Sequence, residues 1–242
     1  MNMIDTKWLT RTELLLGNEK LERLKKANVL IVGLGGVGGY AAEQICRAGI
    51  NNMTIIDGDR IVASNRNRQL AALISTNGKE KTDVIANRLL DINPNLNLNV
   101  INEFIRDDRM IEILTNKYDY VVDAIDTLSP KIYLIYHCLK KKLRIVSSMG
   151  AGGKFDPTLV RISDISKSYN CKLARMLRKR LHVLGVYSGF KVVFSPEEVS
   201  KKAVLLTDGE QNKKSTVGTI SYMPPIFGCC CASVVIRDLI GD

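Results

Sequence analysis

The sequence predicts an α/β fold: a doubly wound, mostly parallel, Rossmann-like sheet with helices on both faces and a small C-terminal α+β extension. Short runs rich in β-branched residues alternate with helical segments five times in about 150 residues, as in a parallel sheet built from strand–helix–strand units. The first of these runs leads directly into the glycine-rich stretch IVGLGGVGGY. The alternation ends near Gly153, so we predict a core over 1–153 and an extension over 154–242 that packs on it.

The elements of the core follow from apolar spacing and from the residues that end each element. Leucines in 13–26 lie near helical spacing, and Gly49 is suited to end the helix after the glycine-rich stretch. Pro94 closes a later helix, and Pro130 suits a first helical turn. We expect helices over 13–26, 37–48, 79–93, 108–115 and 130–142, and strands over 27–33, 51–57, 96–101, 118–126 and 143–153, the last of which breaks into a glycine loop.

The extension has a different pattern. Two short apolar runs predict strands over 159–165 and 190–195, with a basic helix over 171–185 between them. The segment 200–219 is mostly polar outside the run AVLL, and we expect it to be mobile. The apolar tail over 229–241 is expected to form a helix that packs back on the core.

Composition narrows the class of protein. The chain of 242 residues has 35 Lys and Arg against 25 Asp and Glu, and this formal net charge of +10 favours a polyanionic partner. No run approaches 18 uninterrupted apolar residues, and the N-terminal stretch lacks the features of a signal peptide, so we expect a cytoplasmic protein without a membrane span. The six cysteines form no pair of C-x-x-C clusters, which argues against a structural zinc site. The triplet Cys229–Cys231 is interpreted as small apolar packing.

The glycine-rich stretch predicts a phosphate-binding loop. Gly33, Gly35 and Gly38 fit G-x-G-x-x-G between a strand and a helix. A Cβ there would keep phosphate oxygens from the backbone N–H groups, and the helix N-terminus adds a favourable dipole. Asp57, at the end of the second strand, is placed to accept hydrogen bonds from ribose hydroxyls. These features fit a nicotinamide dinucleotide and ATP equally well.

Three charged residues favour ATP that is cleaved at its α-phosphate. Arg68 and Lys81 can place positive charge on the β- and γ-oxygens as they leave. Asp126 lies at the C-terminal end of the fourth strand, at the edge where such sheets bind ligands, and could hold Mg²⁺ on the phosphates. Each also has a simpler interpretation: solvated surface charge for Arg68 and Lys81, and a helix N-cap ahead of Pro130 for Asp126. Their joint placement makes a nicotinamide oxidoreductase the less favoured alternative.

The sequence resembles the ubiquitin-activating-enzyme-like (ThiF/MoeB/HesA) superfamily, whose members adenylate carboxylates with ATP and Mg²⁺. The resemblance rests on five motifs that occur in the order G-x-G-G-x-G, D-x-D, N-x-x-R-Q, a lysine and D-A-x-D. The resemblance runs from about Arg11 to Gly153. It implies a homodimer in which Arg11 reaches the partner's site. It also implies a phosphate loop of Gly33, Gly35, Gly36 and Gly38, a ribose site at Asp57 lined by Asp59 and Asn65, polyphosphate binding by Arg68 and Lys81 with Gln69 beside them, and metal binding by Asp126.

Beyond Gly153 the chain resembles the tRNA threonylcarbamoyladenosine dehydratase branch of that superfamily. This resemblance rests on the glycine loop that ends the strand over 143–153 and on the motifs D-P-T, D-I-S-K and C-x-L-A-R-x-x-R-K. It implies an ATP-dependent enzyme that dehydrates and cyclises N6-threonylcarbamoyladenosine at position 37 of tRNA through an acyl-adenylate, with a sulfur-relay protein as a possible further partner. The alternatives are an adenylating activator of a sulfur-carrier or ubiquitin-like protein C-terminus, and a nucleotide-dependent binding module without catalysis. The role of Cys171 stays open.

The predicted basic helix is the candidate surface for tRNA. Lys172, Arg175 and Lys179 follow helical spacing and share one face, and Arg178 adds to the basic cluster. Such a cluster fits the phosphate backbone of tRNA. The alternative is an ordinary amphipathic helix with a solvated face.

Overall fold

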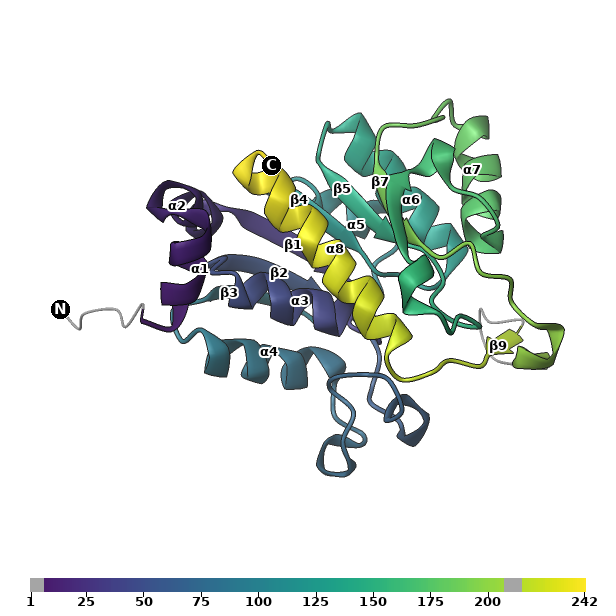
Figure 1. The fold of residues 1–242 in the computed structure, drawn as a ribbon, viewed down its shortest axis with the longest axis horizontal. Coiled ribbons are helices and arrows are strands. Elements are labelled where there is room, and N and C mark those ends of the chain that lie inside the picture. The colour runs from purple at the N-terminus through teal and green to yellow at the C-terminus, as the bar shows by residue number, and fades with distance from the viewer. Residues whose placement is uncertain (1–6, 207–214) are drawn as a thin grey trace.

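The computed structural model describes residues 7–206 and 215–242 and confirms the predicted fold class. A seven-stranded sheet has the order β3-β2-β1-β4-β5-β7-β6, in which β6 alone is antiparallel to its neighbour (Figure 1). The strands are β1 Asn28–Val32, β2 Asn52–Ile56, β3 Asn97–Ile101, β4 Tyr120–Asp123, β5 Ile145–Ser148, β6 Arg161–Asp164 and β7 Lys191–Phe194. A separate antiparallel pair consists of β8 Val204–Leu206 and β9 Ser215–Val217.

Helices cover both faces of the sheet and enclose two hydrophobic cores. The larger core packs under α3, α4 and α8, and the other under α5, α6 and α7. The helices are α1 Thr10–Leu16, α2 Asn18–Lys26, α3 Gly38–Arg47, α4 Lys81–Ile92, α5 Asp107–Ile113, α6 Leu128–Lys140, α7 Lys172–Val183 and α8 Met223–Ile240.

The first predicted helix is divided in two. Gly17 separates α1 from α2 and has φ +79°, a conformation that glycine adopts readily and other residues rarely do. The apolar spacing continues across this break, which is why 13–26 looks continuous in sequence. The division lets α2 bury Leu21 and Leu24, while Leu14 and Leu15 on α1 stay exposed.

The C-terminal extension completes the sheet. β7 pairs with β5 in parallel and β6 closes that edge, so the two predicted strands extend the sheet of the core. The described ends of the polar segment form an antiparallel pair, since β8 lies at the AVLL run and pairs with β9. Residues 207–214 lie outside the described residues, so the expectation of mobility there stays a prediction, as does the division at residue 153.

The tail helix α8 packs back on the core as predicted and begins earlier, at Met223. It lies along α3 and across β4, β5 and β7 (Figure 1, yellow). α8 is long and apolar enough to cross a membrane by length and composition, and half of it is buried inside the protein, as in a core helix. Cys231 is fully buried in it, while Cys229 is exposed, so the packing interpretation holds for only part of the triplet.

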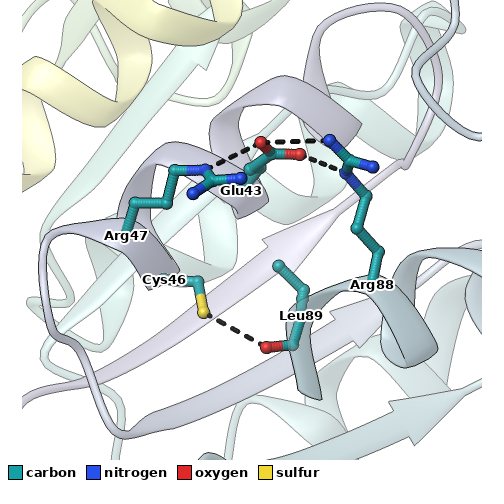
Figure 2. Close-up of polar contacts among 5 residues, drawn as sticks. All are labelled: Glu43, Cys46, Arg47, Arg88 and Leu89. Atoms are coloured by element: carbon teal, nitrogen blue, oxygen red, sulfur yellow. Dashed lines mark hydrogen bonds and ion pairs between the residues drawn. The ribbon is translucent and has the colours of Figure 1, made fainter. Parts of the chain in front are cut away.

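A buried carboxylate fixes α3 against α4. Glu43 on α3 is 7% exposed and accepts hydrogen bonds from Arg47 of its own helix, at 2.8 Å, and from Arg88 of α4 (Figure 2). Burial acts to raise the pKa of Glu43, but the hydrogen bonds from Arg88 and Arg47 hold it below its ordinary value. The Sγ of Cys46 donates to the carbonyl of Leu89, 3.6 Å away, across the same contact. These contacts matter to the site because α3 begins at the glycine loop and α4 begins at Lys81.

Candidate active site

The candidate site lies where the strand order reverses. β1 has β2 on one side and β4 on the other, and Val32 is in register with Asp123. The loops that follow β1 and β4 therefore meet at the carboxyl edge of the sheet, where open α/β sheets bind ligands. The structure thus brings the glycine loop and the loop that carries Asp126 together.

Three glycines of the loop are required by the packing of the protein itself. Gly33 has φ +90°, and a Cβ there would lie 2.8 Å from the carbonyl oxygen of Ala124. A Cβ on Gly38 would lie 1.7 Å from the carbonyl oxygen of Gly33, and one on Gly36 would lie 2.9 Å from Pro224. These positions shape the turn whether or not a ligand is bound.

Gly35 differs from them. The nearest atom to a Cβ at this position is Nε2 of Gln69, at 3.8 Å, an ordinary contact distance. The packing of the described residues gives no reason for a glycine there. Close approach of a phosphate to the backbone does give one.

Asp57 joins the glycine loop to the next segment of the site. Its Oδ2 accepts a hydrogen bond from the N–H of Leu34 at 2.6 Å, and its Oδ1 accepts one from the N–H of Asp59 at 2.8 Å. Burial raises the pKa of the Asp57 carboxyl, and the charge of Lys81 opposes that shift. The carboxylate is therefore held in place at the end of β2.

Lys81, the first residue of α4, is buried beside the same carboxylate. Its Nζ lies 2.5 Å from Oδ2 of Asp59 and 3.9 Å from Oδ1 of Asp57, and the residue is 4% exposed. The simpler interpretation of Lys81 as solvated surface charge is therefore wrong. The structure joins Lys81 to the two aspartates of the D-x-D motif.

The N-x-x-R-Q segment lies along the glycine loop. Asn65 is buried, and its Oδ1 accepts a hydrogen bond from the N–H of Val62. Gln69 is 9% exposed, and among the described residues its Oε1 has no hydrogen-bond partner. A buried oxygen without a donor is costly, so this atom fits a site that is completed by a ligand. The Nη1 of Arg68 donates to the carbonyl oxygen of Ser64 and to Oδ1 of Asn67, both at 2.9 Å.

Asp126 is exposed in the loop after β4. The N-cap of α6 is Thr127, so the simpler interpretation of Asp126 as that N-cap is wrong. No group of three or more His, Cys, Asp or Glu side chains within 7–206 and 215–242 is arranged to hold a metal ion by itself. Mg²⁺ fits Asp126 only together with phosphate oxygens, as is usual for this ion.

Sequence reasoning missed a buried ion pair under this loop. Asp123 and Lys131 are both completely buried, with 2.6 Å between Oδ2 and Nζ. Ser147 donates to the same Oδ2 at 2.6 Å, and Oδ1 accepts from the N–H of Ile125 at 3.1 Å. The network therefore fixes the backbone that leads to Asp126. In the sequence, the D-A-x-D motif contains Asp123 as its first aspartate and so gave a signal for one member of the ion pair. No spacing indicated Lys131 as the other member.

Arg11 lies away from the glycine loop of its own chain. It is exposed on α1, which directly follows Leu9, and Leu9 lies 3.2 Å from where a Cβ on Gly49 would be. Gly49 follows the end of α3, and the glycine loop precedes its start, about 15 Å away along the helix axis. The role of Arg11 in the site of a partner chain stays a prediction.

The basic residues of α7 fall into two groups. Lys172, Arg175 and Lys179 are exposed. Arg178 is half-buried, and its Nη1 donates to the carbonyl oxygens of Ser168, at 2.8 Å, and Ile165, at 3.4 Å. Arg178 therefore holds the preceding segment against α7. Cys171, just before the helix, is 7% exposed and carries a free thiol.

The mostly parallel sheet carries a glycine loop where its strand order reverses, and Lys81 is buried beside Asp57 and Asp59 near this loop. These features define a nucleotide-binding α/β protein. The chain belongs to the ThiF family, whose profile matches residues 9–242. This confirms the family that the sequence motifs resemble.

The similarity to two dehydratases extends over almost the whole chain, and the similarity to an adenylyltransferase over part of it. The tRNA threonylcarbamoyladenosine dehydratase of Bacillus subtilis (strain 168) is 36% identical over 240 residues, which is 96% of this chain and 94% of the relative. The crystal structure of the Escherichia coli tRNA N6-threonylcarbamoyladenosine dehydratase TcdA in complex with ATP has a TM-score of 0.89 at 32% identity and covers 99% of this chain and 97% of that one. The molybdopterin-synthase adenylyltransferase of Escherichia coli (strain K12) is 31% identical over 150 residues, 62% of this chain and 60% of the relative.

Proposed function

We propose that this protein catalyses the ATP-dependent dehydration and cyclisation of N6-threonylcarbamoyladenosine at position 37 of tRNA. The observation that carries the proposal is the extent of the similarity. It includes β6, α7 and β7 and spans almost the full length of both the dehydratase from Bacillus subtilis and this chain. The similarity to a molybdopterin-synthase adenylyltransferase covers 62% of the chain.

The reaction begins with activation of a carboxylate. An oxygen of the threonyl carboxylate attacks the α-phosphorus of ATP, and pyrophosphate leaves, which gives an acyl-adenylate. A nucleophile of the same side chain then attacks the activated carbonyl, its proton is released, and AMP leaves with the former carboxylate oxygen. The modified nucleoside thus loses the elements of one water, while ATP becomes AMP and pyrophosphate.

The residues of the site act mainly through charge and alignment. The N–H groups around Gly35 and the start of α3 would hold phosphate, and Asp57, with Asp59 and Asn65 near it, would hold the ribose. Arg68 and Lys81 would stabilise the leaving pyrophosphate, with Gln69 beside them. Mg²⁺ held by Asp126 would neutralise charge on the phosphate oxygens.

The position of Arg11 supports a proposal about the assembly. Because Arg11 lies at the far end of α3 from its own glycine loop, we propose a homodimer in which it reaches the partner's site. We also propose that the enzyme acts in the cytoplasm, with a sulfur-relay protein as a further partner. The exposed cations Lys172, Arg175 and Lys179 of α7 would bind tRNA through its phosphates.

The decisive experiment uses tRNA that carries N6-threonylcarbamoyladenosine. The protein is incubated with this tRNA, ATP and Mg²⁺, and the nucleoside is examined by mass spectrometry. We expect a loss of the mass of one water that requires ATP. An unchanged mass, with ATP–pyrophosphate exchange only after addition of a carrier protein, would instead support an activator of a sulfur-carrier or ubiquitin-like protein.

A further inference from the structure

The connector between β9 and α8, residues 218–222, contacts the loop after β5 and the N-x-x-R-Q segment of the site. The N–H of Gly153, in the glycine loop after β5, donates to the carbonyl oxygen of Gly218 at 2.7 Å. Nδ2 of Asn67, beside Arg68, donates to the carbonyl oxygen of Thr219 at 2.9 Å. Pro224, just beyond the connector, packs against Gly36 of the phosphate loop. The connector, which runs from β9 to the start of α8 (Figure 1), therefore contacts the segment around Arg68, and the start of α8 contacts the phosphate loop.

Asn67 makes two contacts of different kinds through one carboxamide. Its Nδ2 donates to Thr219, which is 152 residues away in sequence, and its Oδ1 accepts the hydrogen bond from Nη1 of Arg68 at 2.9 Å. A carboxamide has one end that donates and one that accepts, so it can bind a carbonyl oxygen and a guanidinium at the same time. Alanine or serine at this position could not make both contacts.

The Arg68 guanidinium keeps donors for a ligand. Within 7–206 and 215–242, both hydrogen bonds of the Arg68 side chain use Nη1, and neither uses Nε or Nη2. The carbonyl oxygen of Arg68 lies 3.4 Å from where a Cβ on Gly36 would be, so the residue stands beside the phosphate loop. A planar guanidinium that is fixed on one side is well suited to bind phosphate oxygens with the other.

We propose that Asn67 is a positioning residue that holds Arg68 in place for the polyphosphate of ATP by fixing it to the connector at Thr219. The inference rests on the proposed function insofar as Arg68 binds the β- and γ-phosphates. It adds a residue that acts through Arg68 and through the C-terminal extension. AMP lacks the β- and γ-phosphates, so the role of Asn67 should be specific to ATP.

The test compares ATP and AMP binding by titration calorimetry in the presence of Mg²⁺. We expect Asn67→Ala to weaken ATP binding about tenfold, the size expected for a hydrogen bond to a charged group, and AMP binding less than twofold. In an Arg68→Ala background, Asn67→Ala should change ATP binding less than twofold, because its effect passes through Arg68. Asn67→Ser serves as a second variant should the alanine protein fold poorly.

Asn99→Ala is the matched control, since Asn99 is an exposed asparagine on β3. It should bind both nucleotides as the wild type does. Unchanged ATP affinity in Asn67→Ala, equal losses for ATP and AMP, or additive losses with Arg68→Ala would each overturn the proposal. Failure of the wild-type protein to remove water from the modified tRNA would count against the proposed function, and the nucleotide titrations would still decide the role of Asn67.

Discussion

The ammonium group of Lys81 lies 2.5 Å from Oδ2 of Asp59, and the lysine is almost completely buried. Asp57 is close enough, at 3.9 Å, to share the same positive charge. Lys81 therefore lowers the electrostatic cost of placing two carboxylates beside a site for a polyanion. Since α4 begins at Lys81 and is tied to α3 through Glu43 and Arg88, the lysine is fixed relative to the phosphate loop.

Replacement of Lys81 should show this role. Lys81→Met would leave Asp57 and Asp59 without their shared cation and would remove charge stabilisation from the leaving pyrophosphate. We expect kcat/KM for ATP to fall by about 10²- to 10³-fold, measured as AMP formed with modified tRNA. Lys79→Met, at an exposed lysine two residues earlier, should retain wild-type activity. Equal activity of the two variants would exclude a role for Lys81 in catalysis.

The glycines of the phosphate loop should separate into two classes. Gly38→Ala places a Cβ 1.7 Å from the carbonyl oxygen of Gly33, so it should destabilise the protein by more than the roughly 1–3 kcal/mol typical of overpacking. Gly35→Ala meets no such contact and should melt close to the wild-type temperature, yet bind ATP at least about tenfold more weakly. Thermal unfolding and calorimetry measure the two effects. Normal ATP binding by Gly35→Ala would place the phosphates elsewhere.

The order of strands and helices could be predicted because each element carries its own apolar pattern. The glycine loop and the D-x-D and N-x-x-R-Q motifs could be located because they are local in sequence. Lys81 could be named as a site residue, but its burial against Asp59 could not, since that contact depends on how α4 packs on α3.

Contacts between distant segments could not be predicted. The pairing of β8 with β9 joins residues on either side of a polar segment, and the hydrogen bond between Asn67 and Thr219 joins residues that no spacing relates. Helical spacing alone also could not separate Arg178 from Arg175. Both lie on a basic helix, but Arg178 faces two carbonyl oxygens of the preceding segment.

The buried pair of Asp123 and Lys131 should contribute to stability in a way that single and double variants distinguish. Lys131→Met leaves a buried carboxylate without its cation, and we expect a loss of about 3–5 kcal/mol in the free energy of unfolding. The double variant Asp123→Asn/Lys131→Met should recover part of this loss. Urea unfolding measures both, with the exposed Lys140→Met as the control on the same helix. A single variant as stable as the control would mean that Asp123 finds another partner.

The two groups of cations on α7 should respond differently to substitution. Lys172, Arg175 and Lys179 are exposed, so alanine at each should weaken tRNA binding and reduce the dependence of log K on log salt by about one unit for each phosphate that is no longer bound. Arg178→Ala should chiefly lower the melting temperature, because its guanidinium binds the carbonyls of Ser168 and Ile165. Filter binding over a range of salt concentrations, together with thermal unfolding, separates the two effects. If Arg178→Ala reduced the salt dependence of tRNA binding without changing the melting temperature, Arg178 would bind tRNA and would not serve mainly to stabilise the fold. If the three exposed variants left the salt dependence unchanged, the tRNA surface would have to lie on another face of the protein.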